Sequence, residues 1–117
     1  MSEACIKLSF FFNKLPDVSY EHFYKHYGHV HADLTVGTKA FGQFNIQRYT
    51  QHHATPEMRE KLRSIGMSVL DWDACSTLWV KSWEDAERFF GSPEYSKLAD
   101  DCKHFMDTSN GIPCMAG

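Results

Sequence analysis

The stretch CIKLSFFFNKLPDVSYEHFYKHYGHVHADL, residues 5–34, predicts a strand, a turn and a long helix. Apolar side chains occupy every second position from Ile6 to Phe12, which is the two-residue period of a β-strand. Phe11 lies on the more polar face and indicates that both faces are partly covered. Ser19 suits the cap of a helix that begins near Tyr20, because its hydroxyl can accept from a free backbone N–H. The core-facing stripe of this helix is predicted at Phe23, Tyr27, Val30 and Leu34.

The remaining chain continues the alternation of strands and helices. It predicts a loop at residues 37–43, a strand at 44–53, a helix at 56–65 ended by Gly66, an irregular segment at 67–73, a strand at 74–82, helices at 83–90 and 93–102, a short strand at 103–107 and a tail at 109–117. This order predicts an α+β fold, a ferredoxin-like βαββαβ unit whose antiparallel sheet has its two main helices on one face. The length suits a single domain, residues 1–117.

The sheet face away from the helices needs a cover as well. We expect it to carry Phe11, Tyr49 and Trp79, which are too large and apolar to stay in water as a group. A second copy of the chain, packed sheet against sheet around a shared or twin cavity, would bury them. The sequence therefore predicts a homodimer.

Composition excludes several classes of partner. The net charge is −3 and the isoelectric point about 6.1, so nucleic acid or an anionic membrane is not expected as the main partner. No apolar run approaches the roughly 20 residues of a membrane span, and the N-terminus lacks the pattern of a signal peptide. The four cysteines are scattered, which predicts free thiols in a reducing, cytoplasmic compartment.

The helix that begins near Tyr20 carries four histidines. His22, His26 and His29 are spaced by four and three residues and share one stripe, which is a spacing that can bind zinc or copper. No acidic or cysteine ligand joins the stripe at matching spacing, so we expect no metal. His22 and His29 are interpreted as a polar face, and His26 as a residue at the rim of a pocket.

His31 differs from these three because it lies four residues after Tyr27, on the inward side of the helix. A histidine half-buried among aromatic rings can stay neutral at pH 7 and act as a base. The alternative is a core histidine that bonds a backbone carbonyl. Both interpretations fit the sequence.

The second strand carries a polar face that suits a pocket. Tyr49, Gln51 and His53 alternate onto one face, where a phenol, an amide and an imidazole could orient a polar aromatic ligand. An exposed strand end is the alternative. Asp71 and Asp73 precede the third strand, and either could pair with a histidine or only form the turn. No phosphate loop, nucleophile motif or dinucleotide fingerprint is present, so a cofactor-free site is expected.

Several segments, taken in order, resemble the EthD family of dimeric α+β barrels. They are SYEHFYKHYGHVHADL with its His-centred helix, RYTQHHA with its Tyr-x-Gln-x-His strand, DWDACSTLWVKSWEDAERFFGSPEY, and DDCKHFMD. The resemblance spans about residues 19–107 and is closest to fungal members of polyketide pathways. The chain has Ala74 where the family has glycine, and Thr77 where a glutamate is often found. The second difference argues against a mechanism that needs a carboxylate inside the barrel.

The resemblance implies a cofactor-free dehydratase or decarboxylase, possibly a cyclase, that acts on an aromatic polyketide intermediate. It assigns catalysis to His31 and His53, with His31 as the base and His53 protonating the leaving group, which predicts a bell-shaped pH profile. The side chains expected to contact the substrate are Tyr27, Tyr49, Gln51, Asp73, Trp79 and His26. Two alternatives are a cofactor-free monooxygenase of the same fold and a non-catalytic ligand-binding dimer.

Overall fold

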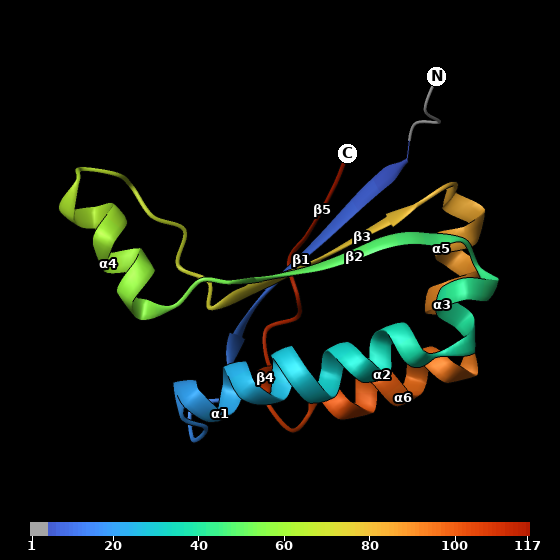
Figure 1. Ribbon diagram of the computed structural model, residues 1–117, viewed down its shortest axis with the longest axis horizontal. Coiled ribbons are helices and arrows are strands. Elements are labelled where there is room, and N and C mark those ends of the chain that lie inside the picture. Colours follow the sequence, from blue (N-terminus) through green and yellow to red (C-terminus); the bar gives the residue numbers. More distant parts are fainter. Residues whose placement is uncertain (1–4) are drawn as a thin grey trace.

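The computed structural model describes the backbone of residues 5–117 and the side chains of these residues except residue 40. The prediction about a signal peptide falls partly on residues 1–4, which lie outside the described part. The elements, in chain order, are β1 (Ile6–Lys14), α1 (Tyr20–Lys25), the π-helical turn η1 (His26–His31), α2 (Ala32–Gly37), α3 (Lys39–Gln43), β2 (Ile46–His53), α4 (Pro56–Ser64), β3 (Ala74–Val80), α5 (Trp83–Phe90), α6 (Pro93–Cys102), β4 (Met106–Asp107) and β5 (Cys114–Ala116) (Figure 1).

The sheet has the strand order β2-β3-β1-β4, and every pair in it is antiparallel. β5 pairs with β1 along the same edge as β4, so the predicted C-terminal tail is wrong. Because β4 is only two residues long, most of that edge of β1 would otherwise be unpaired. The backbone of Lys7 and Gly117 exchanges two hydrogen bonds, of 2.8 and 3.0 Å, which fix the end of the chain there.

Helices cover one face of this sheet, as predicted. The continuous helix from α1 to α2 and the antiparallel α6 lie side by side beneath it (Figure 1). One buried cluster, centred on Leu78, Phe89 and Leu98, lies under the β2 side of the sheet. A second is largely aromatic and includes Phe12 and Tyr27, whose rings meet edge to face at 5.1 Å. The predicted α+β architecture is confirmed.

The first helix differs from the prediction in its register. It continues to Gly37 and contains a π-helical turn, in which the N–H of Ala32 donates to the carbonyl of Tyr27, five residues back. The wider turn changes the direction of the side chains within it and after it, so Val30 and Leu34 are 46% and 45% exposed instead of buried. The inward stripe is Phe23, Tyr27, His31 and Thr35, all spaced by four residues. Residues 39–43 form the short helix α3, where a loop was predicted.

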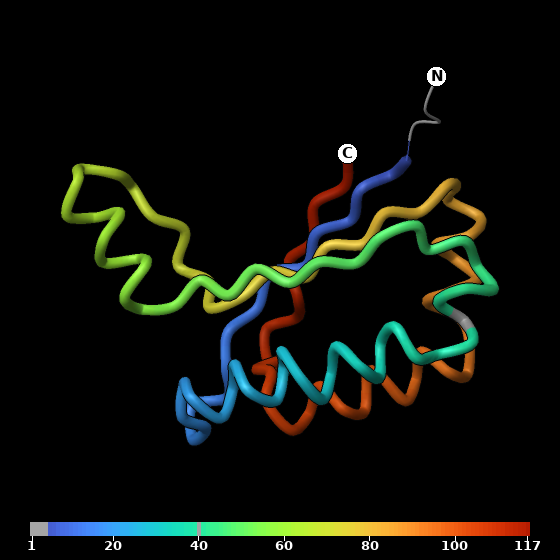
Figure 2. The backbone as a smooth tube through the Cα atoms, viewed as in Figure 1, coloured from blue at the N-terminus to red at the C-terminus, as the bar shows by residue number. Residues whose placement is uncertain are grey.

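No helix of residues 5–117 covers the opposite sheet face, and α4 extends away from the sheet beyond the ends of β2 and β3 (Figure 2). Trp79 lies on this open face, where Lys7 and Arg48 place their cations 5.5 and 5.0 Å from the centre of its ring. Tyr49 lies on the helix side, so its predicted place on the open face is wrong. No helix among residues 5–117 is both long and apolar enough to cross a membrane.

Candidate active site

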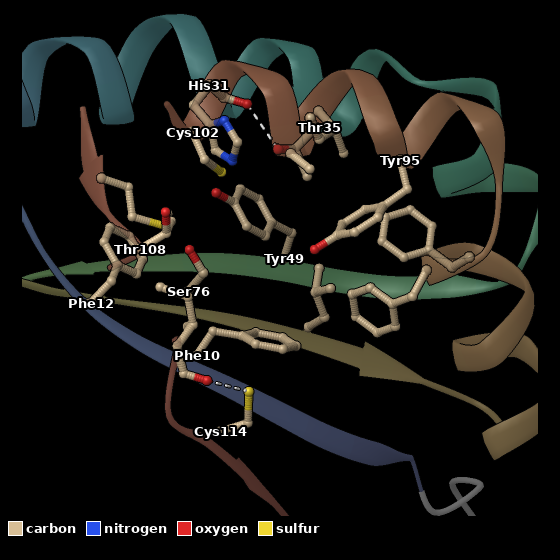
Figure 3. Close-up of a pocket in the computed structure, with 17 residues that line it drawn as sticks. Phe10, Phe12, His31, Thr35, Tyr49, Ser76, Tyr95, Cys102, Thr108 and Cys114 are labelled. Atoms are coloured by element: carbon tan, nitrogen blue, oxygen red, sulfur yellow. Dashed lines mark hydrogen bonds between the residues drawn. The ribbon is translucent and has the colours of Figure 1, made fainter. Parts of the chain in front are cut away.

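A pocket of about 360 Å³ lies between the sheet and the helices (Figure 3). Its walls are mainly apolar and aromatic and come from all layers of the fold, for example Phe10 from β1, Leu78 from β3 and Leu98 from α6. A few polar side chains interrupt these walls, among them His31 and Tyr49. An apolar cavity of this size with few polar groups is typical of a small-molecule site. We call it the helix-side pocket.

His31 projects from η1 into the helix-side pocket, with its ring directed toward the hydroxyl of Tyr49 (Figure 3). Its Nδ1 lies 2.9 Å from Oδ2 of Asp101 on α6. A carboxylate can only accept, so this contact requires the proton on Nδ1 and leaves Nε2 free to accept a proton. The arrangement is that of a base whose tautomer is fixed by a carboxylate.

The same carboxylate also accepts from His26. Nε2 of His26 lies 3.0 and 3.1 Å from the two oxygens of Asp101. His26 does not line the helix-side pocket but binds the carboxylate that holds His31, and its contact with substrate stays a prediction.

Burial sets the charge state of this group. Burial lowers the pKa of His31 below the usual 6.5, although the hydrogen bond that His31 donates to Asp101 acts in the opposite direction. Burial also acts to raise the pKa of Asp101, but the hydrogen bonds from His31 and His26 outweigh it, and the pKa of Asp101 lies below its ordinary value. At pH 7 the pair is therefore a neutral imidazole beside an ionised carboxylate.

Gln51 fixes the direction of the hydrogen bonds on β2. Its Nε2 lies 2.7 Å from the backbone oxygen of Tyr27, which can only accept, so this atom is the amide nitrogen. The same nitrogen donates to the hydroxyl oxygen of Tyr49 at 2.7 Å. Because this oxygen already accepts from Gln51, its own proton is left to donate, either to the neighbouring hydroxyls of Ser76 and Thr35 or to a ligand in the helix-side pocket.

Tyr49 stays protonated in this environment. Burial raises its pKa above the usual 10, although hydrogen bonds with Gln51, Ser76 and Thr35 act to lower it. Ser76 also lines the pocket and bonds the hydroxyl of Tyr27 at 2.7 Å. Tyr27 is fully buried and does not line the pocket itself, and its contact with substrate stays a prediction.

The structure separates His53 from His31, contrary to the expectation that one cavity holds both. Nε2 of His53 donates to Oε1 of Gln51 at 2.9 Å, and its ring packs on Tyr27 with ring centres 5.0 Å apart. His53 is not among the residues that line the helix-side pocket. Tyr27 neighbours both histidines, since its ring centre is also 6.3 Å from that of His31.

Asp73 and Trp79 also lie outside the helix-side pocket. The carboxylate of Asp73 pairs with Arg59 of α4 at 2.6 Å and accepts from the backbone of Lys14 at 2.8 Å. Both charged side chains are more than nine-tenths buried, so Asp73 joins α4 to the sheet and does not face a substrate. Trp79 points to the open face. Neither residue lines the helix-side pocket, and their contact with substrate stays a prediction.

A second cavity, of about 540 Å³, lies on the other side of the molecule beside α4. His53 lines it together with Phe11, Leu62 and Trp72, and much of its wall is exposed apolar surface. It lacks a paired acid and base like His31 and Asp101. We therefore place the candidate chemistry in the helix-side pocket.

Two functional side chains were not predicted. Asp101 was missed because it lies 70 residues from His31, and only the packing of α6 on η1 joins them. Tyr95 of α6 lines the pocket with its hydroxyl turned inward (Figure 3). For Asp101, the one signal in the sequence was its place in the acidic pair Asp100 and Asp101, at the end of an otherwise apolar helical stripe.

No group of three or more His, Cys, Asp or Glu side chains in the described part of the chain is arranged to hold a metal ion. Cys102 lines the pocket beside His31, but burial raises its pKa to about 12. A thiol in this state is a poor nucleophile and a poor metal ligand.

The sequence matches the EthD domain family over residues 15–109. A similar structure is that of an EthD-family protein from Bacillus halodurans, with a TM-score of 0.64 and 16% identity over 97% of each chain. A dimeric protein of unknown function and ferredoxin-like fold from Bacteroides fragilis has a TM-score of 0.61 and 12% identity, over 97% of this chain and 94% of the other. The ferredoxin-like fold is thereby confirmed.

Hydroxynitrile lyase from Passiflora edulis has a TM-score of 0.57 and 11% identity, over 99% of this chain and 94% of that enzyme. At such identities the likeness concerns the fold alone. Comparison with curated protein sequences gives no match. These three similar structures are not described as polyketide-pathway proteins, so that part of the resemblance stays a prediction.

Proposed function

The chain belongs to the EthD domain family, and we propose that it is a cofactor-free lyase that acts on a compact aromatic, polyketide-like substrate in the helix-side pocket. The observation that carries this proposal is the neutral His31, which Asp101 orients with a free Nε2 toward an apolar cavity. Aromatic walls favour a flat substrate, and the volume of about 360 Å³ suits one of two or three fused rings.

Dehydration is the reaction that this charge state favours. Nε2 of His31 takes the proton on the carbon next to a substrate carbonyl, and the C–H electrons form an enolate. The hydroxyl of Tyr49 donates a hydrogen bond to the enolate oxygen, where the negative charge develops. The enolate then re-forms the carbonyl and a carbon–carbon double bond, and the hydroxyl on the next carbon leaves with the proton that His31 had taken. The products are the enone and one water.

Decarboxylation is the second possibility, and the charge state of His31 argues against it. Loss of carbon dioxide leaves a carbanion that must receive a proton, so the reaction begins with a protonated acid. Burial lowers the pKa of His31 and keeps the imidazole neutral at pH 7. In either reaction His31 would transfer the proton without a second histidine, because His53 does not line the pocket.

Lyase chemistry is compatible with the fold, since one protein of similar structure is a hydroxynitrile lyase. We propose that the protein is a homodimer, as the similar ferredoxin-like protein from Bacteroides fragilis is dimeric. The open sheet face with Phe11 and Trp79 is the surface that a second copy would cover. We propose a reaction without cofactor, because the acid–base group and the hydrogen-bond donor are both supplied by side chains.

The proton transfer can be tested without the native substrate. A bicyclic aromatic ketone, 2-tetralone, is incubated with the protein in D₂O, and loss of the signal from the protons next to the carbonyl is followed by NMR. We expect the protein to accelerate this exchange and His31→Gln to slow it by about 10²–10⁴-fold. His29→Gln is the matched control, because His29 is exposed on the same helical turn.

The same experiment separates the alternatives. Exchange that is equally fast in His31→Gln would contradict the assignment of the base. Oxygen uptake during reaction with anthrone would instead indicate a monooxygenase. Binding of 2-tetralone without any acceleration of exchange would favour a ligand-binding dimer.

A further inference from the structure

The π-helical turn η1 brings together two histidines that an ordinary helix would separate. His26 and His31 are five residues apart, and in an α-helix such residues point about 140° away from each other. In η1 the backbone hydrogen bonds close over five residues, so positions five apart lie on the same side. Both rings therefore reach one carboxylate, that of Asp101, with Nε2 of His26 at 3.0 Å and Nδ1 of His31 at 2.9 Å.

We propose that His26 is a positioning residue that holds Asp101 and, through it, sets the tautomer and the basicity of His31. This inference rests on the proposed role of His31 as the base. It gives the π-helical turn a function, since only that turn lets both histidines reach the carboxylate. Such turns are often found at functional sites.

The geometry of the three side chains supports the proposal. Nε2 of His26 lies within 3.1 Å of both oxygens of Asp101, so it must carry a proton and donate to the carboxylate. This contact fixes the plane of the carboxyl group and leaves Oδ2 directed at Nδ1 of His31. The side chains of His26, Asp101 and His31 are 16%, 10% and 10% exposed, so water competes little with these hydrogen bonds.

His26 also connects the buried pair to the surface. Its ring lies 6.0 Å from those of the exposed His22 and His104, between centres. The positive charge of His26 acts to lower the pKa of His31, whereas Asp101 acts to raise it.

The groups that face the two histidines come from three parts of the fold. His26 faces Asp101 on α6, His22 on α1 and His104 after α6, and its ring packs on Phe105. His31 faces Asp101, packs beside Tyr27 and Phe105, and points toward the hydroxyl of Tyr49 (Figure 3). Of these groups, the carboxylate of Asp101 is the one that forms a hydrogen bond with the ring of His31.

The test uses side-chain NMR of histidine-labelled protein, titrated from pH 4 to 9. In the wild type we expect His31 to be a single Nδ1–H tautomer. His26→Gln keeps a donor for Asp101 but carries no charge, so the tautomer should persist while the titration midpoint of His31 rises by roughly half a unit. His26→Ala removes the donor as well, and we expect the Nε2–H tautomer of His31 to appear. His29→Gln should change neither property.

The proposal is overturned if the tautomer and the midpoint of His31 in both His26 variants equal those of His29→Gln. If His26→Ala does not fold, the titration midpoint of His31 in His26→Gln still tests the proposal, because a midpoint equal to that of His29→Gln overturns it. The readout needs no turnover, so it is independent of the exchange assay with 2-tetralone. The two tests can therefore disagree. If the tautomer or midpoint of His31 changes in the His26 variants but His31→Gln does not slow exchange, the proposed function is contradicted and the link between His26 and His31 stands.

Discussion

Nδ1 of His31 lies 2.9 Å from Oδ2 of Asp101, although 70 residues separate the two in the chain. The histidine comes from a π-helical turn and the aspartate from the last full turn of α6. Their contact fixes the proton on Nδ1 and leaves Nε2 as an acceptor in an apolar pocket. This pair turns a buried histidine into a candidate base.

Replacing Asp101 by Asn should impair the base while the protein remains folded. The variant has no negative charge to fix the Nδ1–H tautomer or to stabilise the imidazolium, so exchange of 2-tetralone protons should slow by about 10²–10⁴-fold. The matched control is Asp100→Asn, because Asp100 is its exposed neighbour and pairs only with Lys103 among the ion pairs of the described residues. Equal rates in the two variants would contradict the pairing as a functional feature.

Tyr49→Phe should remove the donor that stabilises the enolate. The rest of the ring stays, so binding of 2-tetralone should change little while the exchange rate falls by about 10²–10³-fold. Tyr20→Phe is the control, since Tyr20 is exposed and lies outside the helix-side pocket. A Tyr49→Phe variant that loses affinity but keeps its rate would show that this hydroxyl only binds the ketone.

A plot of the exchange rate against pH should have one rising limb and no falling limb near neutral pH. The active form of His31 is neutral, and burial lowers its pKa below 6.5, so the rate should rise with pH through a midpoint below 6.5 and then level off. Burial raises the pKa of Tyr49 above 10, so this donor should cause no descending limb below that pH. In Asp101→Asn the limb should move to lower pH, because the carboxylate acts to raise the pKa of His31. A bell centred near neutrality, as expected for a pair of catalytic histidines, would contradict the structure.

Asp73→Asn should destabilise the protein by about 3–5 kcal/mol, because it leaves the buried cation of Arg59 without its partner. Asp71 also contacts Arg59, at 3.2 Å, but its side chain is 89% exposed, so Asp71→Asn should change stability little. Urea unfolding followed by circular dichroism measures both. Similar unfolding midpoints would show that Asp73 does not anchor α4. The pH titration of His31 should be unchanged in the two variants.

Trp79→Glu should weaken the proposed homodimer. It places a charge on the open sheet face, where a second copy would bury it. Sedimentation velocity should show a dimer for the wild type and a shift toward monomer for the variant. Trp83→Glu is the comparison, since Trp83 is exposed at the start of α5. If both variants sediment as the wild type does, the dimer uses another surface.

Local features of the sequence predicted most of the fold. The two-residue period of β1 and the caps Ser19, Ser82 and Ser92 depend on contacts between neighbours in the chain, and the structure has strands and helices at those places. The same patterns missed β5. Its residues form a strand because the short β4 leaves the edge of β1 open. This pairing depends on a distant part of the chain, so the local sequence of β5 does not predict it.

The sequence by itself determined the order of strands and helices, the inward position of His31 and the shared face of Tyr49, Gln51 and His53. These follow from helical and strand periodicity, which is set within a few residues. Only the tertiary structure decided what those side chains contact. The π-helical turn changes the register of the helix, and the packing of α6 on η1 brings Asp101 to two histidines. His31 and His53 line different cavities, and the buried ring of Tyr27 packs beside both of them.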